Sequence, residues 1–399
     1  MEIKLILLVG FLVYLNLSCI HKPVDQRVTM NANPINLKIE GDINNYLQID
    51  SIYDEIKAIP LETKENCLIS FIIKPIIQGD RIFIQDNTQR LLVFNTQGKY
   101  LFDIGSRGRG PGEFLELRDF DIDKEGNIYI LDFQKIHKYN NDGNYLGRVT
   151  FDFLQSKGEI RCNPFQFVLK NHDDFYIWGG SFSIKDNSAG KLFAMYEMNS
   201  GGKIINTFFP LEHNITGGLF RFKRFREEIL IDPVFGSNVL YSLDDAGIKE
   251  KYYIDFGKKT LDIPVPKGFT SLLEFKTNVD KKYFHSISGF TETSDWLYFM
   301  FTYKMHVYNV YFSKKLNKSF LSNQWPLVTG RIAPWMISSN YDDNLVAFSD
   351  PKYIMEQIDK CKLEDLNSLP ANDKKIIEGL SQIKITDNPI FFICKMRNY

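Results

Sequence analysis

Positively charged side chains recur at wide intervals along this sequence, in segments that separate predicted β-strands. An arginine guanidinium donates forked, charge-assisted hydrogen bonds to carboxylates and sulfates, and a nearby aromatic ring offers a flat apolar surface to a sugar. The pattern predicts a site for an anionic small molecule or a glycan; the alternative is that these are ordinary solvated charges. The candidate ligand-binding residues are Arg107, Arg109, Arg161, His213, Arg221, Arg331 and Trp335, with Arg118, Phe165, Lys281, Lys282 and Trp325 near them.

Patterns that support catalysis are weak in this chain. Only His213 and His285 fall in suitable connecting segments, and a three-histidine zinc site needs a third imidazole. Neither G-x-S-x-G nor H-E-x-x-H occurs, which removes two common hydrolase motifs. Asp86, Asp132 and Asp232 end predicted strands at similar places, where we expect side-chain bonds to nearby backbone rather than a metal. The sequence predicts no catalytic residue, no metal and no cofactor.

The glycine-rich stretch 105–112 invites comparison with a phosphate-binding loop. Such a loop needs a strand before it and a helix after it. Residues 113–117 instead continue into another predicted strand. We therefore expect these glycines to allow tight turns with positive φ.

A degenerate repeat organises the chain. Residues 80–101 contain a strand, a polar break after an Asp, a second strand, a turn ending in Gly and a third strand, and residues 126–146 repeat this order. Turns of this composition between apolar runs are a strong hairpin signal. Equivalent positions in six copies are Ile82, Ile128, Phe175, Ile229, Leu297 and Leu345, at spacings of 46, 47, 54, 68 and 48 residues.

A period near this length with several strands per unit predicts an all-β, six-bladed β-propeller with four-stranded antiparallel blades. The last repeat is incomplete, so we expect strands at 52–61 and 389–396 to pair and close the ring. Apolar spacing predicts helices at about 352–360 and 373–383, in an insertion at 351–386. The alternative is two β-sandwiches in series.

Composition narrows the function classes. The chain has 399 residues, a formal net charge of −1 and 44% hydrophobic residues. This hydrophobic content is enough for a packed core and excludes wholesale disorder. The neutral charge balance argues against a nucleic-acid partner, which requires a basic surface.

The first 18 residues read as a lipoprotein signal peptide. Lys4 precedes an apolar run of eleven residues, Leu5 to Leu15, which is shorter than the roughly 20 residues that span a bilayer. Cys19 follows at the expected cleavage point and is the predicted lipidation site; the alternative is a secretory signal that leaves a free thiol. Residues 19–50 are expected to form a tether, and residues 51–399 the propeller.

Several motifs resemble a family of six-bladed β-propeller lipoproteins of Bacteroides-type bacteria, related to NHL repeats. They are Ile59-Pro60-Leu61-Glu62-Thr63, Cys67-Leu68-Ile69, Ile104 to Phe114 and Asp387-Asn388-Pro389. The likeness is specific over about residues 55–150. It implies the fold, export and a binding role without an established reaction. Lipoproteins of this kind also imply a place in the cell envelope, at the periplasmic side of the outer membrane.

In a propeller, the loops that lead into the inner strands meet at one face. Here they are about 63–70, 104–119, 154–166, 209–222, 257–284 and 321–335, and the candidate cations given above lie in five of the six. We therefore expect a non-catalytic, membrane-anchored protein that binds an anionic small molecule, a glycan or a partner protein at this face. A metal-dependent hydrolase or lyase of the NHL or gluconolactonase-like type is one alternative, and a scaffold for a membrane protein partner is the other.

Overall fold

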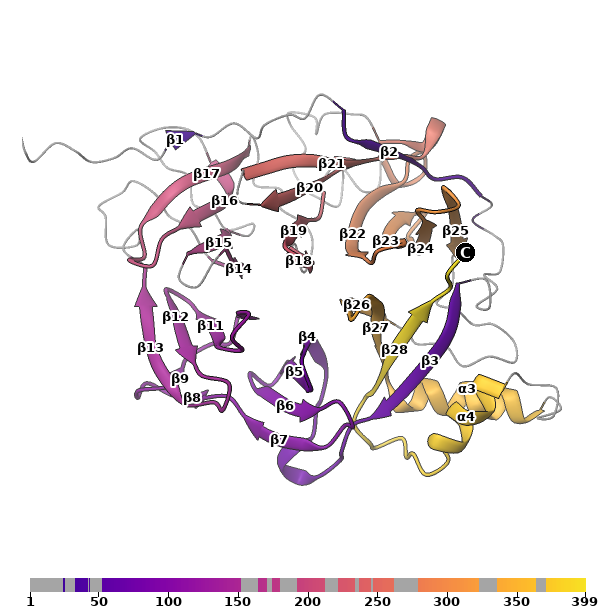
Figure 1. Cartoon of the computed structure of the whole chain (residues 1–399), viewed down its shortest axis with the longest axis horizontal. Coiled ribbons are helices and arrows are strands. Elements are labelled where there is room, and N and C mark those ends of the chain that lie inside the picture. The colour runs from indigo at the N-terminus through magenta and orange to yellow at the C-terminus, as the bar shows by residue number, and fades with distance from the viewer. Residues whose placement is uncertain are drawn as a thin grey trace, which may run out of the picture.

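Six small β-sheets are arranged in a ring in the computed structural model, so the predicted six-bladed propeller is confirmed (Figure 1). The inner strand of each sheet borders the central channel, and the outer strand forms the rim. The structure describes residues 24–25, 33–41, 43, 52–151, 164–170, 174–179, 192–211, 222–233, 237–244, 247–261, 279–322, 336–363 and 371–399.

The blades follow one another along the chain, each listed here from the inner to the outer strand. Blade 1 comprises β4 (Ile72–Gln78), β5 (Arg81–Asp86), β6 (Leu91–Asn95) and β7 (Tyr100–Asp103); blade 2 comprises β10 (Asp119–Ile122), β11 (Ile128–Asp132), β12 (Lys135–Tyr139) and β13 (Tyr145–Thr150). Blade 3 comprises β14 (Gln166–Leu169), β15 (Phe175–Trp178), β16 (Leu192–Met198) and β17 (Ile204–Leu211); blade 4 comprises β18 (Phe222–Phe225), β19 (Glu228–Ile231), β20 (Val239–Asp244) and β21 (Gly247–Asp255). Blade 5 comprises β22 (His285–Glu292), β23 (Trp296–Tyr303), β24 (His306–Ser313) and β25 (Lys318–Ser322); blade 6 comprises β26 (Met336–Tyr341), β27 (Asn344–Ser349), β28 (Ile390–Met396) and β3 (Tyr53–Pro60).

The predicted glycine turns join the third and fourth strands of the early blades. Asn95 begins the first of these turns, and its Oδ1 accepts hydrogen bonds from the amides of residues 97 and 99. Gly98 has a φ of 83°, and a Cβ there would lie 2.1 Å from the carbonyl oxygen of Pro60. Glycine is needed at this position because the turn has a left-handed conformation and because the neighbouring blade approaches its backbone closely.

The two ends of the propeller domain meet in blade 6. Strand β28 pairs antiparallel with β3 from Ile390–Pro60 to Met396–Tyr53, and with β27 on its other side. The predicted closure by terminal strands is therefore confirmed. Because β28 has a partner on both edges, the ring closes through ordinary sheet hydrogen bonds.

The segment predicted as a tether also contributes strands. β1 (Val24–Asp25) pairs parallel with the outer strand β17, and β2 (Ile35–Lys38) pairs parallel with the outer strand β21. Blades 3 and 4 therefore have five strands instead of the four predicted. In Figure 1 both strands lie at the rim of the ring.

Two helices form an arm beside blade 6, as predicted. They are α3 (Pro351–Leu363) and α4 (Ala371–Gly379), and they connect β27 to β28. Their apolar side chains, among them Ile354 and Ile376, are buried in a cluster with residues of β3 and β28. This face of the arm is therefore part of the core.

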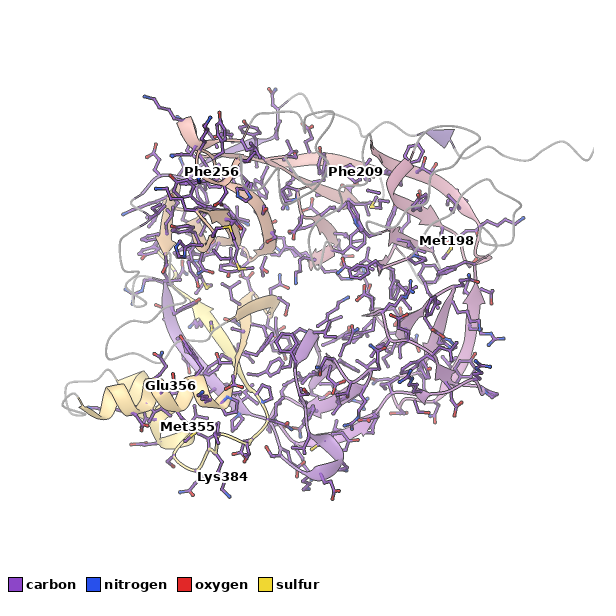
Figure 2. All side chains as sticks on the ribbon, turned by 180° about the vertical axis from the view of Figure 1, so that it is seen from behind. Met198, Phe209, Phe256, Met355, Glu356 and Lys384 are labelled. Atoms are coloured by element: carbon purple, nitrogen blue, oxygen red, sulfur yellow. The ribbon has the colours of Figure 1, made fainter. Side chains whose placement is uncertain are left out.

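The hydrophobic core lies between neighbouring blades. Each of the clusters of buried side chains in the described part of the chain joins two adjacent sheets. Met198, Phe209 and Phe256 belong to three different clusters and lie in different sectors of the ring (Figure 2). This arrangement leaves the channel-facing edges of the inner strands for polar side chains.

Candidate functional site

The ring has two faces with different connections. We call the side at which each inner strand begins the loop face; it carries the connections between blades and the turns between second and third strands. The opposite side, the hairpin face, carries the turns between first and second and between third and fourth strands. The predicted binding residues belong to segments of the loop face.

The structure describes two of the predicted ligand-binding residues, Arg107 and Arg109. Both are exposed. Arg107 lies in β8 (Ser106–Arg107), which pairs parallel with β9 (Glu113–Phe114) near the outer strands β7 and β13, at the rim (Figure 1). The other predicted residues, Arg161, His213, Arg221, Arg331, Trp335 and Cys19, lie outside the described residues. The convergence of these side chains stays a prediction.

The glycine-rich stretch forms the predicted tight turn. Gly105 has a φ of 61° and Gly112 a φ of 75°, and β9 follows in place of a helix. The Glu113 carboxylate accepts a hydrogen bond of 2.7 Å from the amide of Gly110, and the Tyr139 hydroxyl donates to the carbonyl of Gly112. The loop is therefore held by its own side chains and those of blade 2.

Large apolar side chains are exposed on the loop face of the first three blades. Phe71 precedes β4, Leu115 precedes β10, and Phe165 precedes β14, while Phe133 lies in the turn between β11 and β12. Each of these four residues has between 43% and 52% of its surface exposed. We call these four residues, together with Arg118, the aromatic patch.

Arg118 connects Phe133 to the segment that precedes Phe165. Its guanidinium lies over the Phe133 ring, 3.9 Å from the ring centre, and donates a hydrogen bond of 2.8 Å to the carbonyl of Pro164, which precedes Phe165. Phe133 has a φ of 45°. A bulky side chain in this conformation is unusual and strained, so the fold keeps an exposed aromatic ring where glycine would be easier.

The strand-ending aspartates support this face. Asp86 Oδ1 accepts from the amides of residues 88 and 90, which confirms the predicted turn. Asp132 instead accepts from the amides of Leu115 and Glu116, at 3.2 and 3.1 Å, and so fixes the start of the patch. The pKa of Asp132 is lowered overall. Burial alone would raise this pKa, but the hydrogen bonds from His137 and from these amides have the larger combined effect. Asp232 similarly accepts from the amides of residues 289 and 290.

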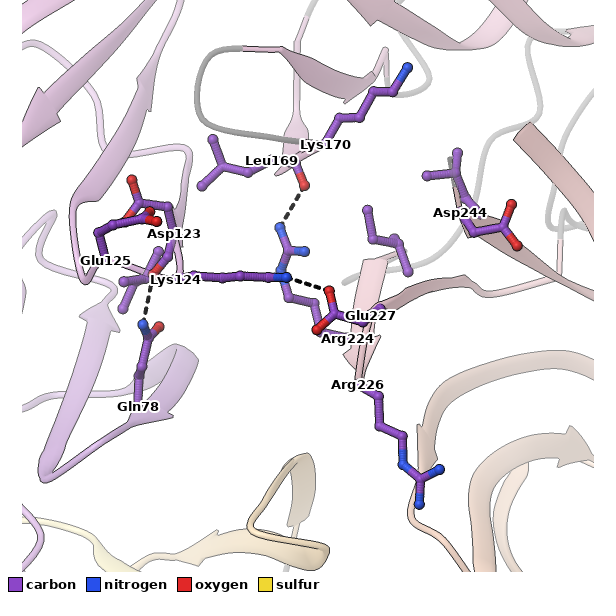
Figure 3. Close-up of a pocket in the computed structure, with 13 residues that line it drawn as sticks. Gln78, Asp123, Lys124, Glu125, Leu169, Lys170, Arg224, Arg226, Glu227 and Asp244 are labelled. Atoms are coloured by element: carbon purple, nitrogen blue, oxygen red, sulfur yellow. Dashed lines mark hydrogen bonds and ion pairs between the residues drawn. The ribbon is translucent and has the colours of Figure 1, made fainter. Parts of the chain in front are cut away.

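The hairpin face has a pocket that the sequence analysis did not predict. It has a volume of about 460 Å³ and is bordered by blades 1 to 4 (Figure 3). Gln78 donates to the carbonyl of Asp123 at 2.7 Å, and Lys124 pairs with Glu227 across the pocket. Residues of these types are common in exposed turns, so their sequence positions alone carry no signal.

Polar side chains line the channel between the inner strands. Asp119 Oδ2 and Asp121 Oδ2 accept from the amides of Phe167 and Leu169 in the next blade, at 2.9 and 2.8 Å. Lys74 Nζ lies 2.7 Å from Asp119 Oδ1. Burial raises the pKa of Asp119, although Lys74 opposes this effect. These bonds satisfy strand edges that face no other strand.

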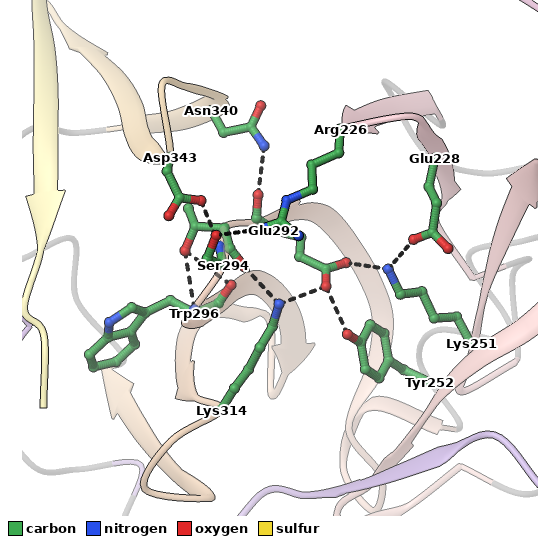
Figure 4. Close-up of polar contacts among 11 residues, drawn as sticks. Arg226, Glu228, Lys251, Tyr252, Glu292, Ser294, Trp296, Lys314, Asn340 and Asp343 are labelled. Carbon is green, nitrogen blue, oxygen red and sulfur yellow. Dashed lines mark hydrogen bonds and ion pairs between the residues drawn. The ribbon is translucent and has the colours of Figure 1, made fainter.

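A second polar cluster connects blades 4, 5 and 6 (Figure 4). Glu292 at the end of β22 is only 2% exposed. Its carboxylate accepts from Lys251 at 2.8 Å, Lys314 at 2.7 Å and the Tyr252 hydroxyl at 2.8 Å. Its carbonyl accepts from Asn340 of β26. These polar groups form hydrogen bonds and ion pairs with one another, which indicates a structural role for the cluster.

The described residues contain neither a metal-binding cluster nor a membrane-spanning helix. Within the described ranges, no group of three or more His, Cys, Asp or Glu side chains is placed to hold a metal ion. His285, one of the two histidines considered above, is buried and contacts Asp280 at 2.9 Å and Ser286 at 2.8 Å. None of the helices described is both long and apolar enough to cross a membrane.

Comparisons with known proteins agree with the fold. A family model described as a domain of unknown function, DUF4934, matches residues 34–395. The crystal structure of an inferred exported protein of Bacteroides fragilis is similar, with a TM-score of 0.70 and 19% identity over 92% of this chain and all of that one. Among curated proteins, none matches the sequence.

Two other structures are more distant. YCF48 bound to a D1 peptide has a TM-score of 0.38 at 9% identity, covering 75% of this chain and 81% of that one. The WD40 domain of Pan2 from Neurospora crassa has a TM-score of 0.37 at 10% identity, covering 77% and 82%. At this similarity neither carries an argument about this chain.

Proposed function

The chain belongs to the family DUF4934, whose function is unknown, and from this premise we propose that it is a non-catalytic binding protein that takes an anionic glycan at its loop face. The aromatic patch is the observation that carries the proposal. Exposed apolar side chains are normal when scattered singly, but a group of them on one face marks an interaction site.

The chemistry of the patch suits a sugar with acidic groups. Phe133 and Phe165 present ring faces on which the C–H face of a sugar can pack. Arg118 lies on Phe133 and is paired with Glu116 at 3.0 Å, and the exposed Arg107 and Arg109 belong to the same connection between blades. Guanidinium groups recognise carboxylates and sulfates through paired hydrogen bonds.

We also propose that the protein is exported and anchored in the cell envelope through a lipid on Cys19, facing the periplasm from the outer membrane. The apolar run before Cys19 supports this proposal, as does the description of the Bacteroides fragilis structure as an exported protein. Labelling cells with palmitate tests it. The label is expected on the wild-type protein and not on Cys19→Ser.

The binding proposal is tested with heparin and polygalacturonate as anionic probes and dextran as a neutral one. Phe133→Gly removes a ring and suits the positive φ of this position, and Phe165→Ala removes the second ring. An aromatic contact contributes about 0.5–1.5 kcal/mol beyond its buried area, so we expect each variant to bind an anionic probe at least threefold more weakly in calorimetry.

Leu146→Ala is the matched control, because Leu146 is an exposed apolar residue of the outer strand β13 in blade 2. Equal affinity of the wild type, both patch variants and this control for every probe would overturn the proposal. Tight binding of dextran but of neither anionic probe would support a sugar ligand and contradict an anionic one. A stoichiometric metal in the purified protein, or a membrane protein that copurifies, would favour the enzymatic or scaffold alternatives.

A further inference from the structure

A small cavity lies inside the channel, beneath the hairpin face. Its volume is about 180 Å³, which is equivalent to roughly six water molecules at about 30 Å³ each, or to one small organic acid. Gln78 and Arg224 line both this cavity and the hairpin-face pocket. The cavity and the pocket therefore adjoin at these two residues.

Cationic side chains enter this cavity from two inner strands. Lys74 comes from β4, and Lys223 and Arg224 come from β18. Arg224 donates 2.8 Å to Asp121 and 2.6 Å to the carbonyl of Leu169. Lys74 lies 2.7 Å from Asp119. Asp121 and Asp119 thus hold Arg224 and Lys74 in place, and Lys223, which interacts electrostatically with Asp232 and Lys74, lines the same space.

An unpartnered hydroxyl lies on the inner strand of blade 6, which neighbours β4 in the ring. The Oγ of Ser339, in β26, is buried and has no hydrogen-bond partner among the described residues. Ser339 lines the same cavity as Lys223. A buried polar atom without a partner costs about 1–3 kcal/mol, and a ligand oxygen in the cavity would remove this cost.

We propose that the channel cavity is a second binding site, which holds one small dicarboxylate or sulfate-like oxyanion between Lys74, Lys223 and Ser339. The two lysines supply the charge, and the serine hydroxyl donates a hydrogen bond. This site is separate from the aromatic patch, because it opens toward the hairpin face. The proposal for the channel cavity does not depend on glycan binding at the aromatic patch.

The ionisation of Lys223 makes the site sensitive to pH. The pKa of Lys223 is lowered to about 8, mainly by burial and also by the positive charge of Lys74, while Asp232 and Asp119 oppose these effects. Arg224 and Asp121 also border the cavity. An anion favours the protonated lysine, so binding should weaken as the pH rises through 8 and should take up protons near pH 8.

The test is calorimetric titration of the mature chain with sodium malonate and with sodium sulfate at constant ionic strength. Both anions keep their charge between pH 7 and 9.5. We expect binding at pH 7, at least tenfold weaker binding by Lys223→Met, and a few-fold weakening by Ser339→Ala. Lys203→Met, an exposed lysine in a hairpin turn of blade 3, is the control and should bind as the wild type does.

The pH dependence of anion binding separates a binding role of Lys223 from a structural one. Wild-type affinity should fall at least tenfold from pH 7 to 9.5, whereas Lys223→Arg should keep its affinity because arginine stays protonated. An unchanged affinity in Lys223→Met, an equal loss in Lys203→Met, or the same pH dependence in Lys223→Arg and wild type would each overturn the proposal. Phe133→Gly should leave malonate binding unchanged, which distinguishes this site from the aromatic patch.

Discussion

Glu292 illustrates how single buried charges connect the blades. Its carboxylate contacts two lysines and a tyrosine, and one of these lysines, Lys251, also pairs with Glu228 of β19. Burial lowers the pKa of Lys314, an effect that Glu292 partly offsets. Each lysine is therefore tolerated in a poorly solvated place because this carboxylate is present.

Glu292→Gln should lower the free energy of unfolding by about 3–5 kcal/mol, because removal of one partner leaves buried charges uncompensated. Urea unfolding followed by circular dichroism measures the difference. Asp295→Asn is the control, since it removes the partner of Lys315 in a more exposed ion pair, and such pairs contribute about 0–1 kcal/mol. Similar losses in both variants would contradict a special role for Glu292.

The residues of the two proposed sites were only partly predictable from sequence. Arg118 and Phe165 were recognised beside the predicted site, because they fall in a connection between blades. Phe133 was missed, since an aromatic residue in a tight turn has no periodic signal. Lys223 and Ser339 were missed because their relation exists only across the channel, between strands that lie far apart in the chain.

At the level of elements, Asn388 explains why three separate motifs occur together. The side-chain carbonyl of Asn388 accepts from the amide of Ile69, and its amide donates to the carbonyls of Glu62 and Cys67, all at 2.8 Å. Its own backbone amide donates to Thr63. The segment before β28 thereby fixes the connection from β3 to β4.

Asn388→Ala should destabilise the fold by about 2–6 kcal/mol, because it removes the partner of the Ile69 amide and of the Cys67 carbonyl, and each costs about 1–3 kcal/mol when buried. The Glu62 carbonyl keeps its bond from the Cys67 thiol. Asn388 is 2% exposed, so water does not replace these bonds. Thermal unfolding measures the loss. Asn144→Ala, in an exposed hairpin turn where the backbone amide makes the bond, should change stability by less than about 1 kcal/mol.

The elements were predictable where local chemistry repeats. The turn at Asn95–Gly98 recurs at Asn140–Gly143 and Asn199–Gly202, with the same side-chain bonds to the backbone. β1 and β2 were not predicted, because short polar segments that add parallel to a rim have no alternating pattern. Their pairing depends on the open edges of β17 and β21, which only the assembled blade provides.

At the level of the whole molecule, closure of the ring depends on β28. This strand supplies the third strand of blade 6 and the only strand partner that β3 has in the described sheet. Its residues Ile390, Phe392 and Cys394 are buried in the cluster that also holds the helical arm. Loss of the strand would expose this cluster and two sheet edges together.

Deletion of residues 390–399 should therefore prevent formation of a stable ring. We expect the truncated chain to be cleaved at least tenfold faster by thermolysin and to elute earlier in size-exclusion chromatography. Deletion of residues 397–399 alone is the control, because it leaves β28 intact. A compact, protease-resistant product from the longer deletion would show that five complete blades are sufficient.

The global fold was predictable because blade spacing is encoded by repeated local signals, and the closure followed from the incomplete last repeat. The binding face was less predictable. Charge in the connecting loops indicated the loop face, but the structure also has a lined pocket at the hairpin face that comes from turns with ordinary composition. Turn residues become a site only when several blades bring them together.

The pairing of β28 with β3 has a consequence for biosynthesis. Strand β3 is translated long before its partner Ile390–Met396. At about 5–20 residues per second, β3 waits for tens of seconds with an open edge. The ring therefore cannot close until β28 has been synthesised, and chaperones have that interval in which to hold the unclosed arc.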